Sequence, residues 1–530
     1  MRSALIVGSG PSAAGAALAL AEADDCQITV IDVGLTLDEP NRAALQRIAA
    51  RPRQDWPMDD LRLIARQPAA SSTEGVPQKY AYGSDYAFRE VGQRSGLVAS
   101  PGVNDALVSG AYGGFSNVWG AGLLPFPDEA FADWPISARE MAPHYKAVLS
   151  AIPYSAAADD LAEDLPLHAT FSPLPGLSAR ARRILSAYAR HRDSLRQKGV
   201  VLGHGRVALR SHACVKCGLC MTGCPYSLIY SAADTFDDLR RTGRITYHPN
   251  LLAVDVQEDR GRPRVAATNL RTGQLNHFTA DRVYLACGAI GTTRLVLSSL
   301  KKFGEDVMLQ ESAQFIVPFA AVRPTPDPRR EAQHTLVQLF ILLKLLPAKA
   351  EVAHISLYTY NPAFDAALPG WARPFAGAAL RRLSVGLGFL PSSMSPRLRL
   401  RLTGSAGRHQ LPAMSVQSAN GTHRHETALH QIGRQLLRAA PALDLWPVIP
   451  RMTMAAPGKS YHGGGSFPHV QRNSSDLTTD RFGRPRAWDR VHLVDPSVLP
   501  SIAATTFTLT AMANAHRIAR ESWTLAEGGQ

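Results

Sequence analysis

Four cysteines lie within eleven residues near the middle of the 530-residue chain. Cys214, Cys217, Cys220 and Cys224, followed by Pro225, form the pattern C-x2-C-x2-C-x3-C-P. Bacterial ferredoxins use this spacing for iron–sulfur clusters, because short spacers let one loop place several thiolates around a cluster. Tetrahedral zinc more often takes two separated cysteine pairs. The pattern therefore favours an iron–sulfur cluster, with a zinc ion or a loop without metal as the alternatives.

The distribution of the cysteines also bears on where the protein works. The other two, Cys26 and Cys287, stand alone, whereas a disulfide framework would spread its cysteines along the chain. The apolar stretch 5–7 leaves no room for a signal peptide, and no apolar run reaches the roughly 18 residues that a spanning helix needs. We therefore expect a cytoplasmic protein without a transmembrane helix.

A histidine that precedes three glycines is the second feature that could carry chemistry. His462 is followed by Gly463, Gly464 and Gly465. A single histidine is more often structural than catalytic, and this chain has 17 of them. Here, however, the glycines would let a flat ligand approach the backbone while the imidazole faces it. His462 is therefore a candidate functional residue beside a ligand.

The start of the chain has the pattern of a dinucleotide-binding βαβ unit. It predicts a strand over 4–7, a glycine loop over 8–13, a helix over 14–22 and a strand over 27–31. Gly8, Gly10 and Ala13, the last in place of a third glycine, would let the backbone approach a pyrophosphate at the helix N-terminus. Asp32, directly after the second strand, would accept a ribose hydroxyl.

Further elements follow along the chain. A second glycine-rich loop over 110–122 either faces a ligand or is a tight turn. The segments 245–248, 252–256, 265–270 and 277–287 resemble a β-meander, and the last of them turns into a helix at Gly288. A separate unit is predicted from strands over 314–322, 336–343, 352–360 and 398–402 and an amphipathic helix over 426–439.

These elements together resemble the glucose–methanol–choline (GMC) family of FAD-dependent oxidoreductases. The matching segments are 8–13, 113–120, 288–290, 462–466 and 495–500, which follow the family's order through most of the chain. Each segment alone is a weak signal, whereas the ordered set is specific. The resemblance implies an α/β fold, with a Rossmann-like FAD-binding domain and a second substrate domain built on an antiparallel sheet flanked by helices.

The resemblance also implies that the FAD-binding domain is discontinuous. We expect its parts at 1–135, at 201–300 together with the cysteine loop, and at 452–530 together with His462. Residues 136–200 would form a connecting helical segment, and residues 301–451 the substrate domain.

The same resemblance implies roles for individual residues. Those expected to bind FAD are Gly8, Gly10, Ala13, Asp32, Gly113, Gly114, Ser116, Asn117, Gly288, Asp495 and Thr506. His462 matches the family's general base, and Thr506 stands where many relatives hold the substrate hydroxyl with a histidine or asparagine. A hydroxyl can hydrogen-bond a substrate but cannot share the role of base. Some relatives attach the flavin to a histidine at the position of Val118, so we expect FAD to be bound non-covalently.

The cysteine loop is similar to that of the iron–sulfur branch of the family, which includes the catalytic subunit of bacterial FAD-dependent glucose dehydrogenase. That branch holds a three-iron cluster, and the matching residues are Cys214, Cys220 and Cys224. Because Cys217 is additional, both a 3Fe-4S and a 4Fe-4S cluster are open.

The expected activity is that of a dehydrogenase for an alcohol or a sugar. His462 would take the hydroxyl proton while a hydride passes to the flavin. The cluster would then pass electrons to an external acceptor such as a cytochrome, a quinone or another carrier. The alternatives are an oxidase with zinc or no metal in the cysteine loop, and a non-catalytic electron-transfer subunit.

The charge of the chain bears on its partners. The formal net charge is +13, but no Lys/Arg-rich run with interleaved aromatic residues indicates a nucleic-acid partner. Trp371, Phe375 and Phe389 lie near arginines within the segment 361–395. This segment either forms a lid over the substrate site or makes a peripheral contact with an anionic membrane.

Overall fold

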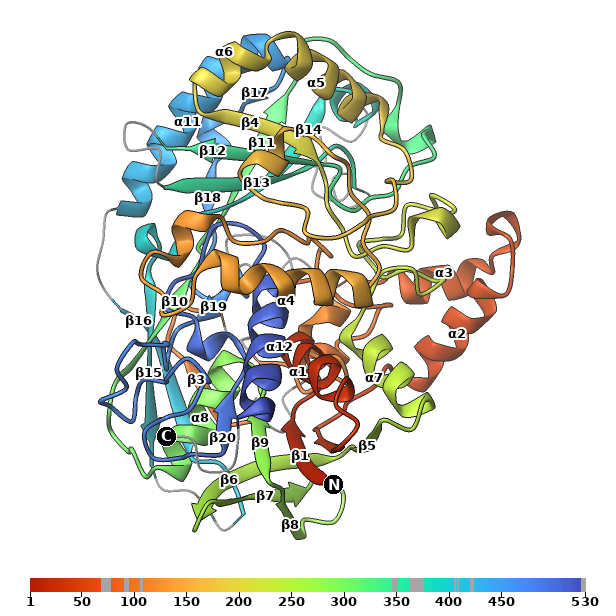
Figure 1. Cartoon of the computed structure of the whole chain (residues 1–530). Coiled ribbons are helices and arrows are strands. Elements are labelled where there is room, and N and C mark those ends of the chain that lie inside the picture. The colour runs from red at the N-terminus through yellow and green to blue at the C-terminus, as the bar shows by residue number, and fades with distance from the viewer. Residues whose placement is uncertain are drawn as a thin grey trace.

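The computed structural model describes residues 1–525 apart from 68–77, 90–94, 105–107, 346–350, 362–375, 405–406, 408 and 420–423. A parallel five-stranded sheet lies in the lower half of the molecule, near the N-terminus (Figure 1). Its order is β20 (Val491–Leu493), β9 (Arg282–Leu285), β1 (Arg2–Val7), β2 (Cys26–Ile31) and β5 (Ile245–His248). The predicted βαβ unit is confirmed, and the sheet combines strands from both ends of the chain.

Two helices from opposite ends of the chain pack beside this sheet. The Ala-rich α1 (Pro11–Ala21) begins at a proline, which suits the first turn of a helix. It lies against α12 (Thr508–Thr524), and a Cβ atom on Gly15 would be only 2.2 Å from the carbonyl oxygen of Met512. Glycine is therefore required for this close approach. The Arg2 guanidinium also donates to the carbonyl oxygen of Trp523 at 2.8 Å.

An antiparallel seven-stranded sheet lies in the upper half of the molecule (Figure 1). Its strands are β17 (Trp446–Pro447), β11 (Gln314–Ala320), β14 (Leu383–Phe389), β13 (Val352–Tyr358), β12 (Leu339–Lys344) and β4 (Val200–His204), with β18 (Thr453–Met454) paired to β11. Side chains alternate between the two faces of a strand. Leu339, Ile341 and Leu343 accordingly pack with the outer helices α5 (Ala179–Arg190) and α11 (Arg424–Leu443). Phe340 faces the inner core.

Two smaller sheets complete the architecture. One is ordered β19 (Gly463–Gly464), β10 (Val307–Glu311), β15 (Arg397–Thr403), β16 (Ala413–Ala419) and β3 (Leu97–Ala99). The other is a meander of β6 (Leu251–Asp259), β7 (Arg262–Asn269) and β8 (Leu275–Thr279). The predicted meander was too long, because β5 and β9 pair with the parallel sheet instead. β9 is buried throughout, which is typical of a parallel strand that is covered on both faces.

The remaining helices connect these sheets. They are α2 (Glu39–Ala49), α3 (Met58–Ile64), α4 (Ala138–Ala151), α6 (Arg192–Gln197), α7 (Ala232–Arg241), α8 (Ala289–Ser299) and α10 (Ala376–Leu380). The predicted strands between residues 314 and 402 and the amphipathic helix are confirmed, the helix being α11. The expected fold class is likewise confirmed: an α/β structure with a Rossmann-like sheet and an antiparallel sheet flanked by helices.

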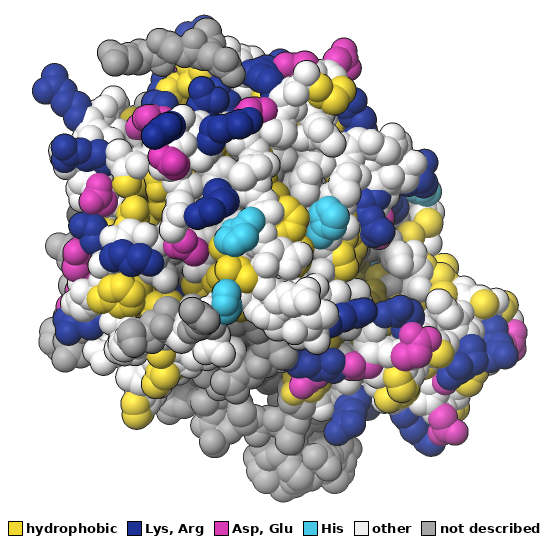
Figure 2. Space-filling model, turned by 90° about the horizontal axis from the view of Figure 1, so that it is seen from below, with side chains coloured by type: hydrophobic (Ala, Val, Ile, Leu, Met, Phe, Trp, Pro, Cys, Tyr) yellow, Lys and Arg dark blue, Asp and Glu magenta, His cyan; other side chains and the backbone are white. Residues whose placement is uncertain are grey.

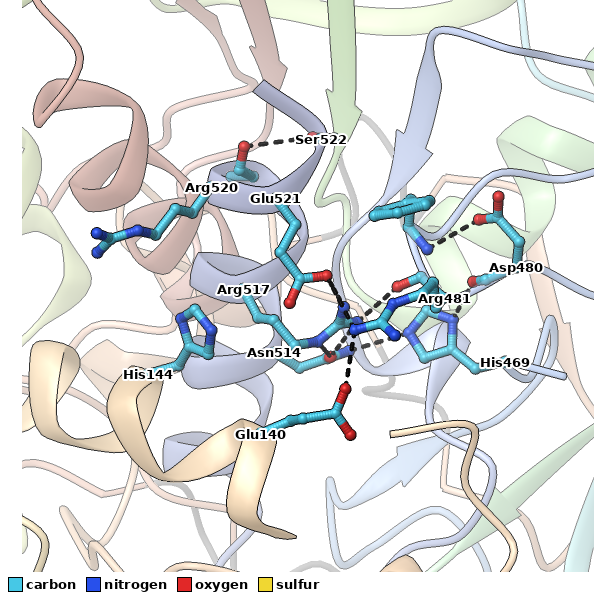
Figure 3. A network of polar contacts seen from close by, with 12 residues as sticks. Glu140, His144, His469, Asp480, Arg481, Asn514, Arg517, Arg520, Glu521 and Ser522 are labelled. Carbon is cyan, nitrogen blue, oxygen red and sulfur yellow. Dashed lines mark hydrogen bonds and ion pairs between the residues drawn. The ribbon is translucent and has the colours of Figure 1, made fainter. Parts of the chain in front are cut away.

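A buried polar network anchors the C-terminal half of α12 (Figure 3). Arg517 is fully buried, and its guanidinium donates to Glu521 at 2.9 Å, to the carbonyl oxygen of Arg481 at 2.7 Å and to Asn514 Oδ1 at 2.9 Å. Arg481 in turn donates to Glu140 on α4 at 3.0 Å. The network fixes the helix whose first turn follows Thr506.

The charged side chains are spread over the surface. On the face shown in Figure 2, Lys and Arg side chains are scattered among acidic and uncharged ones. Along β15, exposed Arg397, Arg399 and Arg401 alternate with buried leucines, and Asp306 forms ion pairs with the last two. Among the described helices, none combines the length and the hydropathy that a membrane crossing requires.

Candidate active site

A cavity of about 370 Å³ lies where the carboxyl ends of the parallel strands meet the antiparallel sheet. Its wall contains residues within two positions of the ends of β1, β2, β9 and β20, which is where open α/β sheets bind their ligands. The cavity brings together nine of the residues predicted from the sequence: Gly8, Gly10, Asp32, Gly114, Ser116, Gly288, His462, Asp495 and Thr506. Segments from the start, the middle and the end of the chain therefore share one site.

The glycines of this wall leave room for a ligand next to the backbone. Gly8 has a φ of 107°, and a Cβ atom there would lie 2.4 Å from the carbonyl oxygen of Ala286. At Gly10 and at Gly288, by contrast, a Cβ atom would find no other atom within 4 Å. Any side chain at these two positions would project into open space, which suits the close approach of a pyrophosphate to the backbone.

Ser9 in the first glycine-rich loop connects Asp32 to Gly113 in the second glycine-rich loop. The Ser9 hydroxyl donates to the Asp32 carboxylate and accepts the Gly113 N–H at 3.0 Å. The Tyr247 hydroxyl also donates to Asp32 at 3.1 Å. Asp32 is 8% exposed, and this burial raises the pKa of its carboxyl to about 7. The carboxylate is thus held at the end of β2, facing the cavity.

Three predicted residues support the site without lining the cavity. Ala13 is buried in α1, against the core. Gly113 has a φ of 90° and makes the bond to Ser9. The Asn117 amide donates to the carbonyl oxygens of Tyr112 at 2.9 Å and Gly114 at 2.8 Å. These residues shape the glycine-rich elements, and the neighbours Gly114 and Ser116 reach the cavity.

His462 lies against two aromatic rings. Its imidazole stacks on Phe389, with ring centroids 4.6 Å apart and an angle of 19° between the planes, and its centroid is 4.8 Å from that of Phe507. The backbone is fixed as well, because the Ser312 N–H donates to the His462 carbonyl oxygen at 3.0 Å. Burial lowers the pKa of His462 to about 4. The imidazole is therefore neutral near pH 7 and can accept a proton.

Thr506 and Asp495 complete the C-terminal part of the wall. The Thr506 hydroxyl oxygen accepts the Leu124 N–H at 2.9 Å, so its own proton is available to a ligand. The Asp495 carboxylate accepts the Thr292 hydroxyl and, at 2.9 Å, the Ser497 N–H. Burial raises the pKa of Asp495. Asp495 thereby ties the end of β20 to α8, next to Gly288.

Several residues that line the cavity were not predicted from the sequence. They are contributed mainly by strands and include Glu311, Gln314, Ser356, Tyr358 and Leu387. For Ser356, Tyr358 and Leu387, the sequence shows only the two-residue period of β13 and β14. This period indicates that alternate residues share one face of a sheet, but it does not indicate what that face covers. Lys79 was missed in a polar stretch without a pattern. Its ammonium donates to the Trp119 carbonyl oxygen at 3.0 Å, and burial lowers its pKa to about 8.

The cysteine loop lies beside the same cavity, which Met221 lines. Cys220 and Cys224 are buried, Cys214 and Cys217 are half-buried, and all four are free thiols. The Thr335 N–H donates to the Cys220 sulfur at 3.4 Å. Burial raises the pKa of Cys217 to about 11 and also raises the pKa values of Cys214 and Cys224. The loop thus gathers its thiols between the surface and the cavity.

In the part of the chain that the structure describes, no group of three His, Cys, Asp or Glu side chains is arranged to hold a metal ion.

The position of Phe389 distinguishes between the two alternatives for the segment 361–395 at this residue. Phe389 is only 5% exposed and lines the cavity, so it packs over the site and does not contact a membrane. It does so from strand β14 of the antiparallel sheet and not from a lid. Trp371 and Phe375 lie outside the described residues.

Comparison with known proteins places the fold. No protein-family model matches the chain, and no curated protein matches it either. Among solved structures, pyridoxine 4-oxidase from Mesorbium loti has 15% identity and a TM-score of 0.61, over 99% of this chain and 100% of that one. A variant of formate oxidase from Aspergillus oryzae, studied for FAD modification, has 12% identity and a TM-score of 0.60, over 98% of each chain. The chain therefore shares the fold of these oxidases over nearly its whole length.

Proposed function

We propose that the protein is an FAD-dependent oxidoreductase of the GMC family that oxidises a hydroxyl group of a small alcohol or sugar. The observation that carries the proposal is the placement of a neutral His462 in the cavity at the carboxyl edge of the Rossmann-like sheet. Additional support comes from a solved structure of the same fold, a formate oxidase whose FAD is named. The ordered sequence elements favour the same family.

One set of residues would bind the cofactor, and another set would bind the substrate and take its proton. Gly8 and Gly10 would lie against the pyrophosphate, and Asp32 would accept a ribose hydroxyl. Bound FAD supplies the acceptor for the hydride of the substrate carbon. His462 takes the proton of the substrate hydroxyl, and the Thr506 hydroxyl donates a hydrogen bond to the substrate oxygen. Stacking on Phe389 keeps the imidazole in one orientation.

We also infer that Cys214, Cys217, Cys220 and Cys224 hold an iron–sulfur cluster. Their spacing, their shared loop and the contact of that loop with the cavity through Met221 support this assignment. A bound cluster supplies a one-electron relay toward an external acceptor such as a cytochrome or quinone. The Thr335 N–H would hold the sulfur of Cys220 in place. A dehydrogenase is therefore the favoured activity.

An oxidase is the second candidate. Both solved structures described above are named oxidases. In this case oxygen would be the electron acceptor, and the cysteine loop would carry no cluster. The iron and sulfide content of the protein separates the two candidates.

The proposed function is tested by anaerobic flavin reduction. The purified holoenzyme is mixed with a panel of alcohols and sugars, and loss of flavin absorbance is followed. His462→Ala is expected to slow the reduction by roughly two to four orders of magnitude, the usual contribution of a positioned base, while FAD remains bound. His430→Ala, at an exposed position on α11, is the control and is expected to behave like the parent. A near-normal rate in His462→Ala would remove this residue from the reaction.

A further inference from the structure

A row of three side chains crosses the inner face of the antiparallel sheet beside His462. Phe389 on β14 lies opposite Gln314 on β11 and opposite His354 on β13. Directly opposite residues of neighbouring strands project from the same face of a sheet. The Phe389 ring also stacks on the imidazole of His462, so Gln314 lies one strand away from the residue that orients the candidate base.

Gln314 has an acceptor atom that no described residue of the protein uses. Its side chain is 7% exposed and lines the cavity. The Gln314 Oε1 atom is buried and has no hydrogen-bond partner among the described residues. Buried polar atoms are nearly always paired, and an unpaired one costs free energy. An unpaired acceptor in a cavity wall therefore indicates a ligand that donates a hydrogen bond.

Glu311 provides a second acceptor from the same segment. It is 2% exposed and lines the cavity, and its backbone pairs with Gly463, directly after the candidate base. One carboxylate oxygen accepts the Gly458 N–H at 2.7 Å. Within the described ranges, no Lys or Arg forms an ion pair with Glu311. A ligand group that donates hydrogen bonds can thus complete the coordination of this carboxyl.

We propose that Gln314 and Glu311 form a subsite for the second hydroxyl group of a polyhydroxy substrate. The substrate would be a sugar or another polyol, with one hydroxyl at His462, a neighbouring hydroxyl that donates to Gln314 Oε1, and Glu311 available to a further hydroxyl. This inference rests on the proposed function and narrows its substrate class. A site built to bond a hydroxyl discriminates strongly against analogues that lack it, because its own polar atoms are then left unpaired.

The subsite is tested with pairs of alcohols that differ by one hydroxyl group. The probes are cis-1,2-cyclohexanediol against cyclohexanol, and glycerol against 1-propanol. Dissociation constants for the holoenzyme are measured by calorimetry, and anaerobic flavin reduction is measured by stopped flow. The parent is expected to bind the diol or triol about tenfold more tightly than its partner, as one or two neutral hydrogen bonds would give.

Two variants replace the Gln314 acceptor with apolar side chains of different shape. If one variant folds poorly, the other can still be tested. In Gln314→Leu and in Gln314→Met, the preference for the diol or triol is expected to fall to about one. Gln417→Leu, at an exposed position on β16, should keep the preference of the parent. Equal binding of both probes by the parent, or an unchanged preference in both Gln314 variants, would overturn the subsite.

The two measurements separate the subsite from the reaction. Tighter binding of the diol that depends on Gln314, without flavin reduction by any alcohol, would support the subsite and contradict the proposed function. Flavin reduction that is equally fast with both members of each pair, together with equal binding, would leave the oxidoreductase intact and reject the subsite.

Discussion

The imidazole of His462 and the ring of Phe389 are stacked at a centroid distance of 4.6 Å and an interplanar angle of 19°. This contact joins the loop that precedes β19 to the inner face of the antiparallel sheet. Offset stacking of two rings limits rotation about the side-chain bonds of both. The sheet therefore orients the candidate base, and it also supplies the low-polarity environment that keeps the base neutral.

The environment of His462 predicts the pH dependence of the reaction. Burial lowers the pKa of His462 to about 4, and only the neutral imidazole accepts a proton. Protonation of His462 should therefore lower the rate of flavin reduction only as the pH drops through about 4, whereas Asp32 and Lys79 in the same cavity titrate near pH 7 and pH 8. The measurement is anaerobic stopped flow on the parent and on His462→Ala, with a substrate that has no titrating group. A loss of rate near pH 6.5, the ordinary pKa of histidine, that is present in the parent and absent from the residual rate of His462→Ala would contradict the burial of the base.

The open space at Gly10 predicts that a side chain there blocks the cofactor. Gly10 has an ordinary φ of −72°, so Gly10→Val introduces no left-handed strain, but its side chain enters the cavity. We expect the variant to fold and to purify largely without FAD. The flavin-to-protein absorbance ratio measures the loss, and circular dichroism compared with parent apoprotein checks the fold. Normal FAD content in Gly10→Val would place the pyrophosphate elsewhere.

The cysteine loop predicts the metal content of the protein. Protein purified without oxygen should contain about three or four iron atoms and matching acid-labile sulfide per chain. Cys220→Ser removes the sulfur that accepts the Thr335 N–H and should lower both contents, whereas Cys26→Ser, buried in the parallel sheet, should not. Iron and sulfide analysis of the parent and of both variants shows whether the cysteine loop holds a cluster. Zinc without sulfide would reject the cluster and favour the oxidase.

The network around Arg517 predicts a large difference between two neighbouring arginines. Arg517→Met leaves Glu521 and Asn514 without their buried partner, so it should lower the free energy of unfolding by about 3–5 kcal/mol. Arg520→Met on the same helix breaks only an exposed pair with Glu22, worth about 0–1 kcal/mol. Thermal unfolding compares the two variants with the parent. Equal melting temperatures for both would show that the network does not anchor α12.

The half of the site that is built from the glycine loops and Asp32 could be predicted because its requirements are local. Gly10 and Gly288 are needed where the backbone must leave space, and Asp32 must follow a strand directly. A glycine beside open space and an acidic residue directly after a strand can each be recognised from a few neighbouring residues in the sequence. The residues that line the cavity from the antiparallel sheet had no such signature.

Gln314 and Phe389 illustrate this second case. They become neighbours only through the pairing of β11 with β14, and they meet His462 only through the packing of that sheet onto the cavity. Phe389, read alone, has the character of an interfacial aromatic residue near arginines. Long-range strand pairing, which the sequence does not specify locally, gives it a different role.

The close packing of α1 against α12 has a consequence for how the protein is made. During synthesis the unit of β1, α1 and β2 emerges from the ribosome early, whereas Met512, which covers Gly15, and Thr506, which lines the cavity, follow far later in the chain. Until then the helix face around Gly15 is uncovered and the cavity lacks one wall. A chain that stops before Thr506 therefore lacks both the cover of α1 and this wall of the cavity.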